Sequence, residues 1–146
     1  MTDHPSSTLL LAHIFTTFFM CGLIWMVQLV HYPSFAYVQA DRYREFQTFH
    51  MLRISWIVIP VMIVEIITGC ILYLLHPTTA WTVNIALLIL IWVSTLALQM
   101  PKHSTLENGK NEQIIEKLIR GNWIRTALWS SRAILLLNLL AENAKA

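Results

Sequence analysis

The chain has 146 residues, of which 56% are apolar and 12% are charged, and its formal net charge at pH 7 is +2. A soluble domain carries about twice that charged fraction, and a small protein with so little polar surface cannot cover its core in water. Composition therefore excludes a soluble globular enzyme and a disordered tail, and the low net charge excludes a nucleic-acid-binding module. An integral membrane protein in contact with a lipid bilayer remains.

Four apolar stretches are long enough to cross a bilayer as helices, which takes about 20 residues each. The last stretch contains two arginines and is the least apolar of the four. The predicted fold is a single all-α domain over residues 1–146, an antiparallel four-helix transmembrane bundle. The predicted spans are residues 9–30, 54–75, 80–100 and 122–140.

The distribution of basic residues predicts the orientation of the bundle. Seven of the ten lysines and arginines lie in two loops, one between the first two spans and one between the last two. The turn over 76–79 has none. Because cytoplasmic loops retain Lys and Arg, both loops are predicted to be cytoplasmic. Both termini then face the periplasmic side of a bacterial inner membrane.

Both cytoplasmic loops are predicted to contain interfacial helical segments. Pro33 is expected to open a short helix over 34–39, and Asp41 to cap a helix that begins at Arg42 and continues into the second span. In the other loop, Asn111 is expected to cap an amphipathic helix. That helix is predicted to lie at the inner interface and to end before the fourth span begins.

Aromatic residues near the predicted span ends are interpreted as an interfacial belt, because amphipathic rings favour the headgroup level. The inner set is Trp25, Tyr32, Trp56 and Trp123, and the outer set is Tyr73 and Trp81.

Two opposite charges fall at matching depth inside the predicted spans. At about 1.5 Å per residue, Glu65 lies roughly 16 Å and Arg132 roughly 15 Å from the inner boundary. An ion in hydrocarbon is costly unless it is paired or reaches water, so we predict that these two side chains face each other. Arg125 and Trp129 share a helix face with Arg132 and extend a polar and aromatic seam toward the cytoplasmic mouth.

Two interpretations of these charges stay open. One is a buried structural ion pair; the other is a polar site, open to the cytoplasm, that binds or oxidises a small amphipathic molecule of the quinone-like or aromatic kind. In the second interpretation the protein is oxidoreductase-like if it is an enzyme at all, Glu65 accepts a proton or orients the ligand, and Arg132 and Arg125 stabilise negative charge. The candidate catalytic residues are Glu65, Arg132, Arg125 and His50.

Histidines gather near the ends of the predicted spans and suggest further alternatives. His31, His50 and His103 at the inner mouth are a candidate site for a metal ion, since three imidazoles suit zinc, copper or iron. An inner pair of these histidines and an outer pair formed by His13 and His76 are also candidate axial ligands of haem b in an electron-transfer subunit. A third alternative is a non-catalytic accessory subunit of a larger membrane complex or a homo-oligomer. The candidate cofactor-binding residues are His31, His103 and Trp129.

Several motifs resemble known membrane proteins. The stretches His31-Tyr-Pro-Ser-Phe, Gln99-Met-Pro-Lys-His103 and Asn122-Trp-Ile-Arg-Thr-Ala-Leu-Trp-Ser-Ser-Arg132 resemble a group of small, functionally uncharacterised bacterial four-helix integral membrane proteins. That resemblance implies the fold. A looser similarity extends to the anthrone-oxygenase-like membrane domain, although Trp129 stands where that domain has a His or Asn. The looser similarity implies an aromatic or quinone-like substrate.

Overall fold

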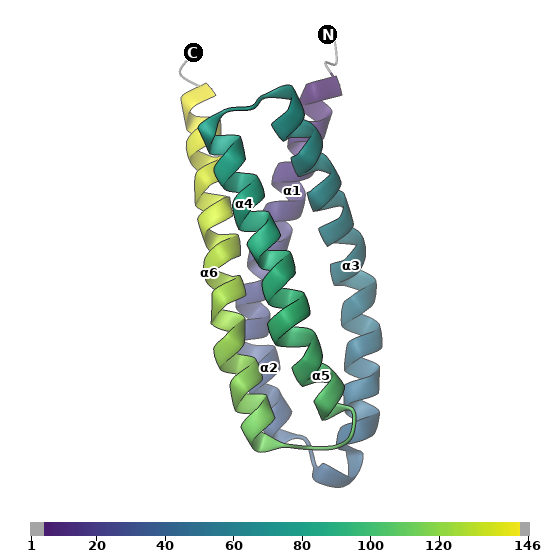
Figure 1. Ribbon diagram of the computed structural model, residues 1–146. Helices are drawn as coiled ribbons and strands as arrows, with labels where there is room; N and C mark the ends of the chain where they lie inside the picture. The colour runs from purple at the N-terminus through teal and green to yellow at the C-terminus, as the bar shows by residue number, and fades with distance from the viewer. Residues whose placement is uncertain (1–4, 144–146) are drawn as a thin grey trace.

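The computed structural model describes residues 5–143, and every regular element in that part of the chain is a helix (Figure 1). The α-helices are α1 (Pro5–Met26), α2 (Tyr32–Ser34), α3 (Tyr43–Leu75), α4 (Thr79–Ser94), α5 (Met100–Leu106) and α6 (Glu112–Asn143). The π-helical turns are η1 (Val27–His31) and η4 (Thr95–Gln99), and the 3₁₀ turns are η2 (Phe35–Tyr37) and η3 (Ala40–Arg42). The predicted all-helical class is confirmed.

Four helical rods form the bundle, and α4 continues through η4 into α5 to make one of them. The rods pack in a ring in which α1 contacts α3 and α6, and α4 contacts the same two neighbours. Helix α1 begins, α6 ends and α3 connects to α4 at one end of the molecule, here called the terminal end (Figure 1). The connection from α5 to α6 lies at the opposite end, here called the loop end (Figure 1).

Three helical stretches are long and apolar enough to cross a membrane: Ser7–Tyr37, Ala40–Leu75 and Thr79–Leu106. Helix α6 covers the predicted fourth span but is not one of these three, so its insertion stays a prediction. Large apolar side chains such as Phe15, Trp56 and Leu74 are more than two-thirds exposed, while ionisable side chains are fully buried between the helices. A bundle with apolar side chains outside and polar ones inside suits a lipid environment.

The first loop is helical, with different boundaries from those predicted. Helix α3 runs without a break from Tyr43 to Leu75, which confirms a continuous helix into the second span. Asp41 lies inside a 3₁₀ turn, and the N-cap position falls at Arg42 with no side-chain cap hydrogen bond, so the predicted Asp41 cap is wrong. The short helix after Pro33 ends as a 3₁₀ turn at Tyr37 and does not reach residue 39.

In the second loop the predicted helix cap is confirmed, but the helix that follows is longer than predicted. The Asn111 side chain accepts a hydrogen bond from the Ile114 N–H at 3.1 Å, as predicted. The amphipathic segment does not end before the fourth span, because α6 continues from Glu112 to Asn143. Gly121 does not break α6: a Cβ atom there would lie 3.2 Å from Gln99 Nε2, so the missing side chain leaves room for Gln99.

The two π-helical turns occur where prolines interrupt the helices. Pro33 follows η1 and Pro101 follows η4, each within the first turn of the next short helix. Because proline has no N–H, the carbonyl group four residues earlier loses its usual partner. The wider turns thus sit where the α-helical hydrogen-bond ladder is already interrupted, and they shift the direction of the side chains that follow.

Backbone carbonyl groups tie the two loops together at the loop end. Arg44 Nε donates to the Asn108 carbonyl oxygen at 2.9 Å, and Lys110 Nζ donates to the Ala36 carbonyl oxygen at 2.7 Å. Between them Gly109 adopts a φ of 137°, a conformation that favours glycine. The first and last connections of the chain therefore form one layer across this end.

Candidate functional site

Glu65 and Arg132 form an ion pair in the interior of the bundle, as predicted from their depth. One carboxylate oxygen of Glu65 accepts from the Arg132 guanidinium and from the Thr17 hydroxyl, the latter at 3.0 Å. The indole N–H of Trp129 lies 3.3 Å from both carboxylate oxygens. Side chains from α1, α3 and α6 therefore meet on a single carboxylate.

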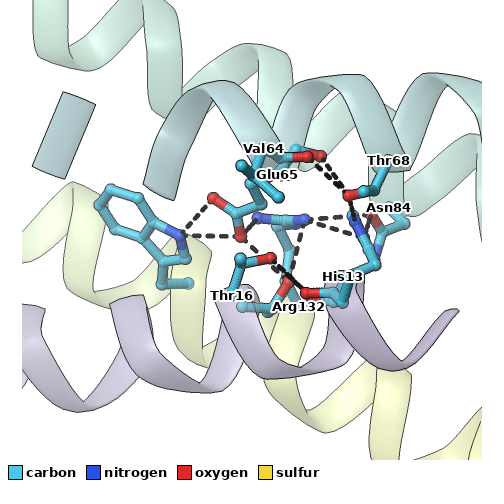
Figure 2. A network of polar contacts seen from close by, with 10 residues as sticks. His13, Thr16, Val64, Glu65, Thr68, Asn84 and Arg132 are labelled. Atoms are coloured by element: carbon cyan, nitrogen blue, oxygen red, sulfur yellow. Dashed lines mark hydrogen bonds and ion pairs between the residues drawn. The ribbon is translucent and has the colours of Figure 1, made fainter. Parts of the chain in front are cut away.

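The other side of the guanidinium faces acceptors on α1 and α4. Arg132 Nη2 lies 3.3 Å from each of Thr17 Oγ1, Asn84 Oδ1 and His13 Nε2. The Nδ1 atom of His13 lies 2.9 Å from the Thr68 hydroxyl, on α3 (Figure 2). The set is called the buried network below and consists of His13, Thr17, Glu65, Thr68, Asn84, Trp129 and Arg132.

The buried network joins all four helical rods and is closed to solvent. Glu65, Arg132, His13 and Asn84 each have a relative exposure of 0%. Within the described residues, only Arg132 Nε and Asn84 Nδ2 of this network lack a hydrogen-bond partner. Near-complete pairing is what allows charged groups to persist in a low-dielectric interior.

A separate cavity of about 320 Å³ lies between α3 and the α4–α5 rod, toward the loop end. It is called the Arg125 cavity below. Apolar side chains of α3, such as Val58 and Met62, form much of its wall. Neither Glu65 nor Arg132 lines it. Its other polar and aromatic lining residues are Tyr32, Ser55, Trp92, Thr95, Gln99, His103 and Arg125.

Arg125 is a buried cation in this wall without a carboxylate partner. Its exposure is 6%, and among residues 5–143 no acidic side chain lies within ion-pair distance. Its Nη1 donates to Asn122 Oδ1 at 3.1 Å, and its guanidinium carbon lies 5.2 Å from the Trp129 ring centroid. Asn122 is held in turn by the Gln28 side chain at 3.0 Å. The positive charge is thus positioned but not neutralised.

Other polar atoms around the Arg125 cavity also lack partners. In the described part of the chain, Trp92 Nε1, Arg125 Nε and both side-chain polar atoms of Gln99 are buried without a hydrogen bond. Leaving a buried polar group unpaired costs about 1–3 kcal/mol, and most such groups in native proteins are satisfied. These atoms belong to residues that line one apolar cavity, and a polar ligand group that reached them would supply the missing hydrogen-bond partner.

The three inner histidines come together beside the cavity, as their positions at one predicted mouth suggested. His31 Nε2 lies 2.8 Å from His50 Nδ1, and the rings of His50 and His103 have centroids 5.4 Å apart. His103 lies 3.0 Å from the Tyr32 hydroxyl and 3.1 Å from Gln47 Nε2, through different ring nitrogens. Only His103 of the three lines the Arg125 cavity. His31 and His50 line a smaller neighbouring cavity of about 160 Å³.

The arrangement of these imidazoles does not favour a zinc site, and the haem alternative stays a prediction. Residues 5–143 contain no group of three or more His, Cys, Asp or Glu side chains that could hold a metal ion. Two nitrogens bound to one tetrahedral zinc at about 2.0–2.1 Å stand more than about 3 Å apart, whereas the His31 and His50 nitrogens are at hydrogen-bond distance. At the terminal end, both ring nitrogens of His13 are engaged by the buried network.

Several residues of both sites were not predicted from the sequence. Tyr32 and Trp81 were expected in an interfacial belt, but their exposures are 5% and 7%, and they pack inside against His103 and His13. Asn84 is the lone amide in the apolar run 83–93, which is the feature that could have identified it. Thr17, Thr68, Gln47 and Trp92 carry no comparable signal in the sequence.

Comparison of the chain with protein-family models, curated proteins and solved structures returns no match. The function has to be inferred from the residues of the site.

Proposed function

We propose that this chain is an integral membrane protein that binds a small amphipathic molecule of the quinone-like or aromatic class in the Arg125 cavity. Its four helical rods cross a bacterial inner membrane as antiparallel spans, with both termini on the periplasmic side. The Arg125 cavity then lies in the cytoplasmic half of the membrane, beside the two basic loops.

The observation that carries this proposal is the unpaired buried charge of Arg125 on the wall of a mostly apolar cavity. A buried arginine is costly without a partner, and a ligand oxygen that accepts hydrogen bonds would supply one. A volume of about 320 Å³ is at the lower end of the range for small-molecule sites, which is roughly 300–1,000 Å³. A single substituted aromatic ring suits that volume.

The chemistry of the wall favours carbonyl oxygens on an otherwise apolar ring. Arg125 and Trp92 can only donate hydrogen bonds, while Val58, Met62 and Leu96 offer apolar contact. A benzoquinone presents two carbonyl acceptors on a flat apolar ring. The resemblance to the anthrone-oxygenase-like domain implies the same ligand class.

In this proposal the predicted site residues divide between two roles. Glu65, Arg132 and Trp129 hold the four helical rods together and do not contact the ligand. Arg125 and His103 face the ligand, and His31 and His50 support the wall behind His103. The functional centre is thus displaced from the Glu65–Arg132 pair toward the loop end.

The experiment measures binding of decylubiquinone to the detergent-purified protein by quenching of tryptophan fluorescence. Trp92 lines the cavity, so saturable quenching is expected, and Trp92→Phe should remove much of it. Arg125→Gln should weaken binding at least about tenfold, which corresponds to about 1.4 kcal/mol. Arg120→Gln is the matched control: it lies one and a half turns earlier on α6, pairs with Glu116 on the surface, and should leave binding unchanged.

Equal binding by wild type and Arg125→Gln would contradict the proposal. Saturable, Arg125-dependent binding of laurate without saturable binding of the quinone would replace the quinone by an anionic lipid as the ligand. If neither compound binds, the accessory-subunit alternative becomes the better account of the protein.

A further inference from the structure

The Tyr32 hydroxyl sits at the boundary between the histidines and the Arg125 cavity. Tyr32 follows the π-helical turn η1 and lines the cavity together with Arg125 and His103. Its side chain is buried, and its hydroxyl lies 3.0 Å from His103 Nε2. Either atom could be the donor, so the direction of this hydrogen bond decides what the tyrosine can offer a ligand.

Gln47 fixes that direction. Its Nε2 atom lies 3.3 Å from the backbone carbonyl oxygen of His103 and 3.1 Å from His103 Nδ1. A carbonyl oxygen can only accept, so the amino group of Gln47 points at His103, and its two hydrogens serve the carbonyl oxygen and Nδ1. Since Nδ1 accepts, the ring carries its hydrogen on Nε2. His103 therefore donates to the Tyr32 oxygen.

A tyrosine oxygen that accepts from His103 keeps its own hydrogen for another partner. Among residues 5–143 the Tyr32 hydroxyl has its hydrogen bond with His103 and also lies beside the Arg125 guanidinium, which can only donate and so leaves the tyrosine hydrogen free. We propose that Tyr32 donates a hydrogen bond to the ligand oxygen beside Arg125, and that Gln47 and His103 are positioning residues that hold it in this donor role. The inference rests on the proposed ligand site.

This arrangement has a consequence for which form of the ligand is bound. Tyr32 and Arg125 are both donors at the proposed ligand oxygen, while the side-chain acceptors among the lining residues are the Gln99 amide oxygen and the Ser55 and Thr95 hydroxyls. A quinone carbonyl at this position accepts from both donors, whereas a quinol hydroxyl at the same position brings a hydrogen that neither Tyr32 nor Arg125 needs. The site should therefore bind the oxidised form more tightly than the reduced form.

The experiment compares decylubiquinone with its quinol in the wild type, Tyr32→Phe and Gln47→Leu proteins. The wild type should favour the quinone by about fivefold, the size expected for one well-placed hydrogen bond. Tyr32→Phe should lose most of that preference while still binding both forms through Arg125. Gln47→Leu leaves the tyrosine in place but frees the His103 tautomer, so it should reduce the preference in the same direction. Tyr37→Phe is the control, because that side chain is 89% exposed.

An infrared measurement separates this role from a general effect on packing. The bound quinone carbonyl stretch should lie at lower frequency in the wild type than in Tyr32→Phe, because the phenol hydrogen bond weakens the C=O bond. If the wild type binds quinone in an Arg125-dependent way but Tyr32→Phe leaves both the preference and the carbonyl frequency unchanged, the role of Tyr32 is wrong and the ligand site stands. If Arg125→Gln and wild type bind alike, the site itself is wrong.

Discussion

The guanidinium of Arg132 is surrounded by acceptors from the three other helical rods. These acceptors stabilise a positive charge that would be costly in hydrocarbon without them. Arg125, seven residues earlier on the same helix, has one amide acceptor and an aromatic face. Of these two arginines on one face of α6, Arg132 thus has an ion-pair partner and several hydrogen-bond acceptors, whereas Arg125 has one acceptor and no carboxylate. The satisfied arginine stabilises the bundle, and the unsatisfied one is the better candidate for ligand contact.

The pairing of Glu65 with Arg132 leads to a prediction about stability. Arg132→Leu alone leaves a buried carboxylate without its cation and should destabilise the protein by about 3–5 kcal/mol. Replacing both residues by Leu should cost less than Arg132→Leu alone. Unfolding of the detergent-solubilised variants, followed by circular dichroism, measures the coupling in a double-mutant cycle.

The exposed pair Glu116–Arg120 on the same helix supplies the control cycle. Its coupling should stay below about 1 kcal/mol, because both side chains remain in a polar environment. Equal couplings in the two cycles would show that the buried pair contributes no more than a surface pair.

At the scale of the elements, close packing of α1, α3 and α4 positions the buried network. Gly69 on α3 lies against His13 of α1 and Leu88 of α4, and a Cβ atom built there would lie 3.0 Å from His13 Cε1. A glycine at this point lets three helices approach closely enough for His13 to reach both Thr68 and Asn84.

Gly69→Ala should therefore push α1 and α3 apart and lower the stability by about 1–3 kcal/mol. Gly22→Ala on α1 is the matched control, since a Cβ atom there meets nothing within 4 Å. That control should be neutral or stabilising by up to about 1 kcal/mol through helix propensity. Thermal unfolding of both variants in one detergent tests the contrast, and similar losses in the two would contradict it.

The whole molecule places the two basic loops at the loop end, opposite the described ends of the chain and the connection from α3 to α4 (Figure 1). The proposed orientation can be tested by cysteine labelling in bacterial spheroplasts, after Cys21 and Cys70 are replaced by Ala. Pro77→Cys should react with a membrane-impermeant maleimide from outside. Asn108→Cys should react only after permeabilisation, because basic loops are retained in the cytoplasm. Labelling of Asn108→Cys in intact spheroplasts would reverse the orientation.

The features that could be predicted from the sequence are those that follow from the position of a residue along one helix. Counting residues fixes depth, so the meeting of Glu65 and Arg132 followed from their positions in separate spans. The Arg125 cavity could not be found in that way, because its shape depends on how α3 packs against the α4–α5 rod. The π-helical turn at η4 also determines where Gln99 points, and a one-residue change in helical register leaves no trace in hydropathy.

The crowded surroundings of Arg132 also bear on how the chain is made. In the proposed membrane arrangement, the spanning part of α6 (122–140) carries two arginines and would partition poorly into lipid by itself during synthesis. The carboxylate and the polar side chains that receive Arg132 lie on α1, α3 and α4, all of which leave the ribosome earlier. The polar partners of Arg132 are thus already in the bilayer when α6 is synthesised. Insertion of α6 then depends on its packing against the three earlier helices as well as on its own hydrophobicity.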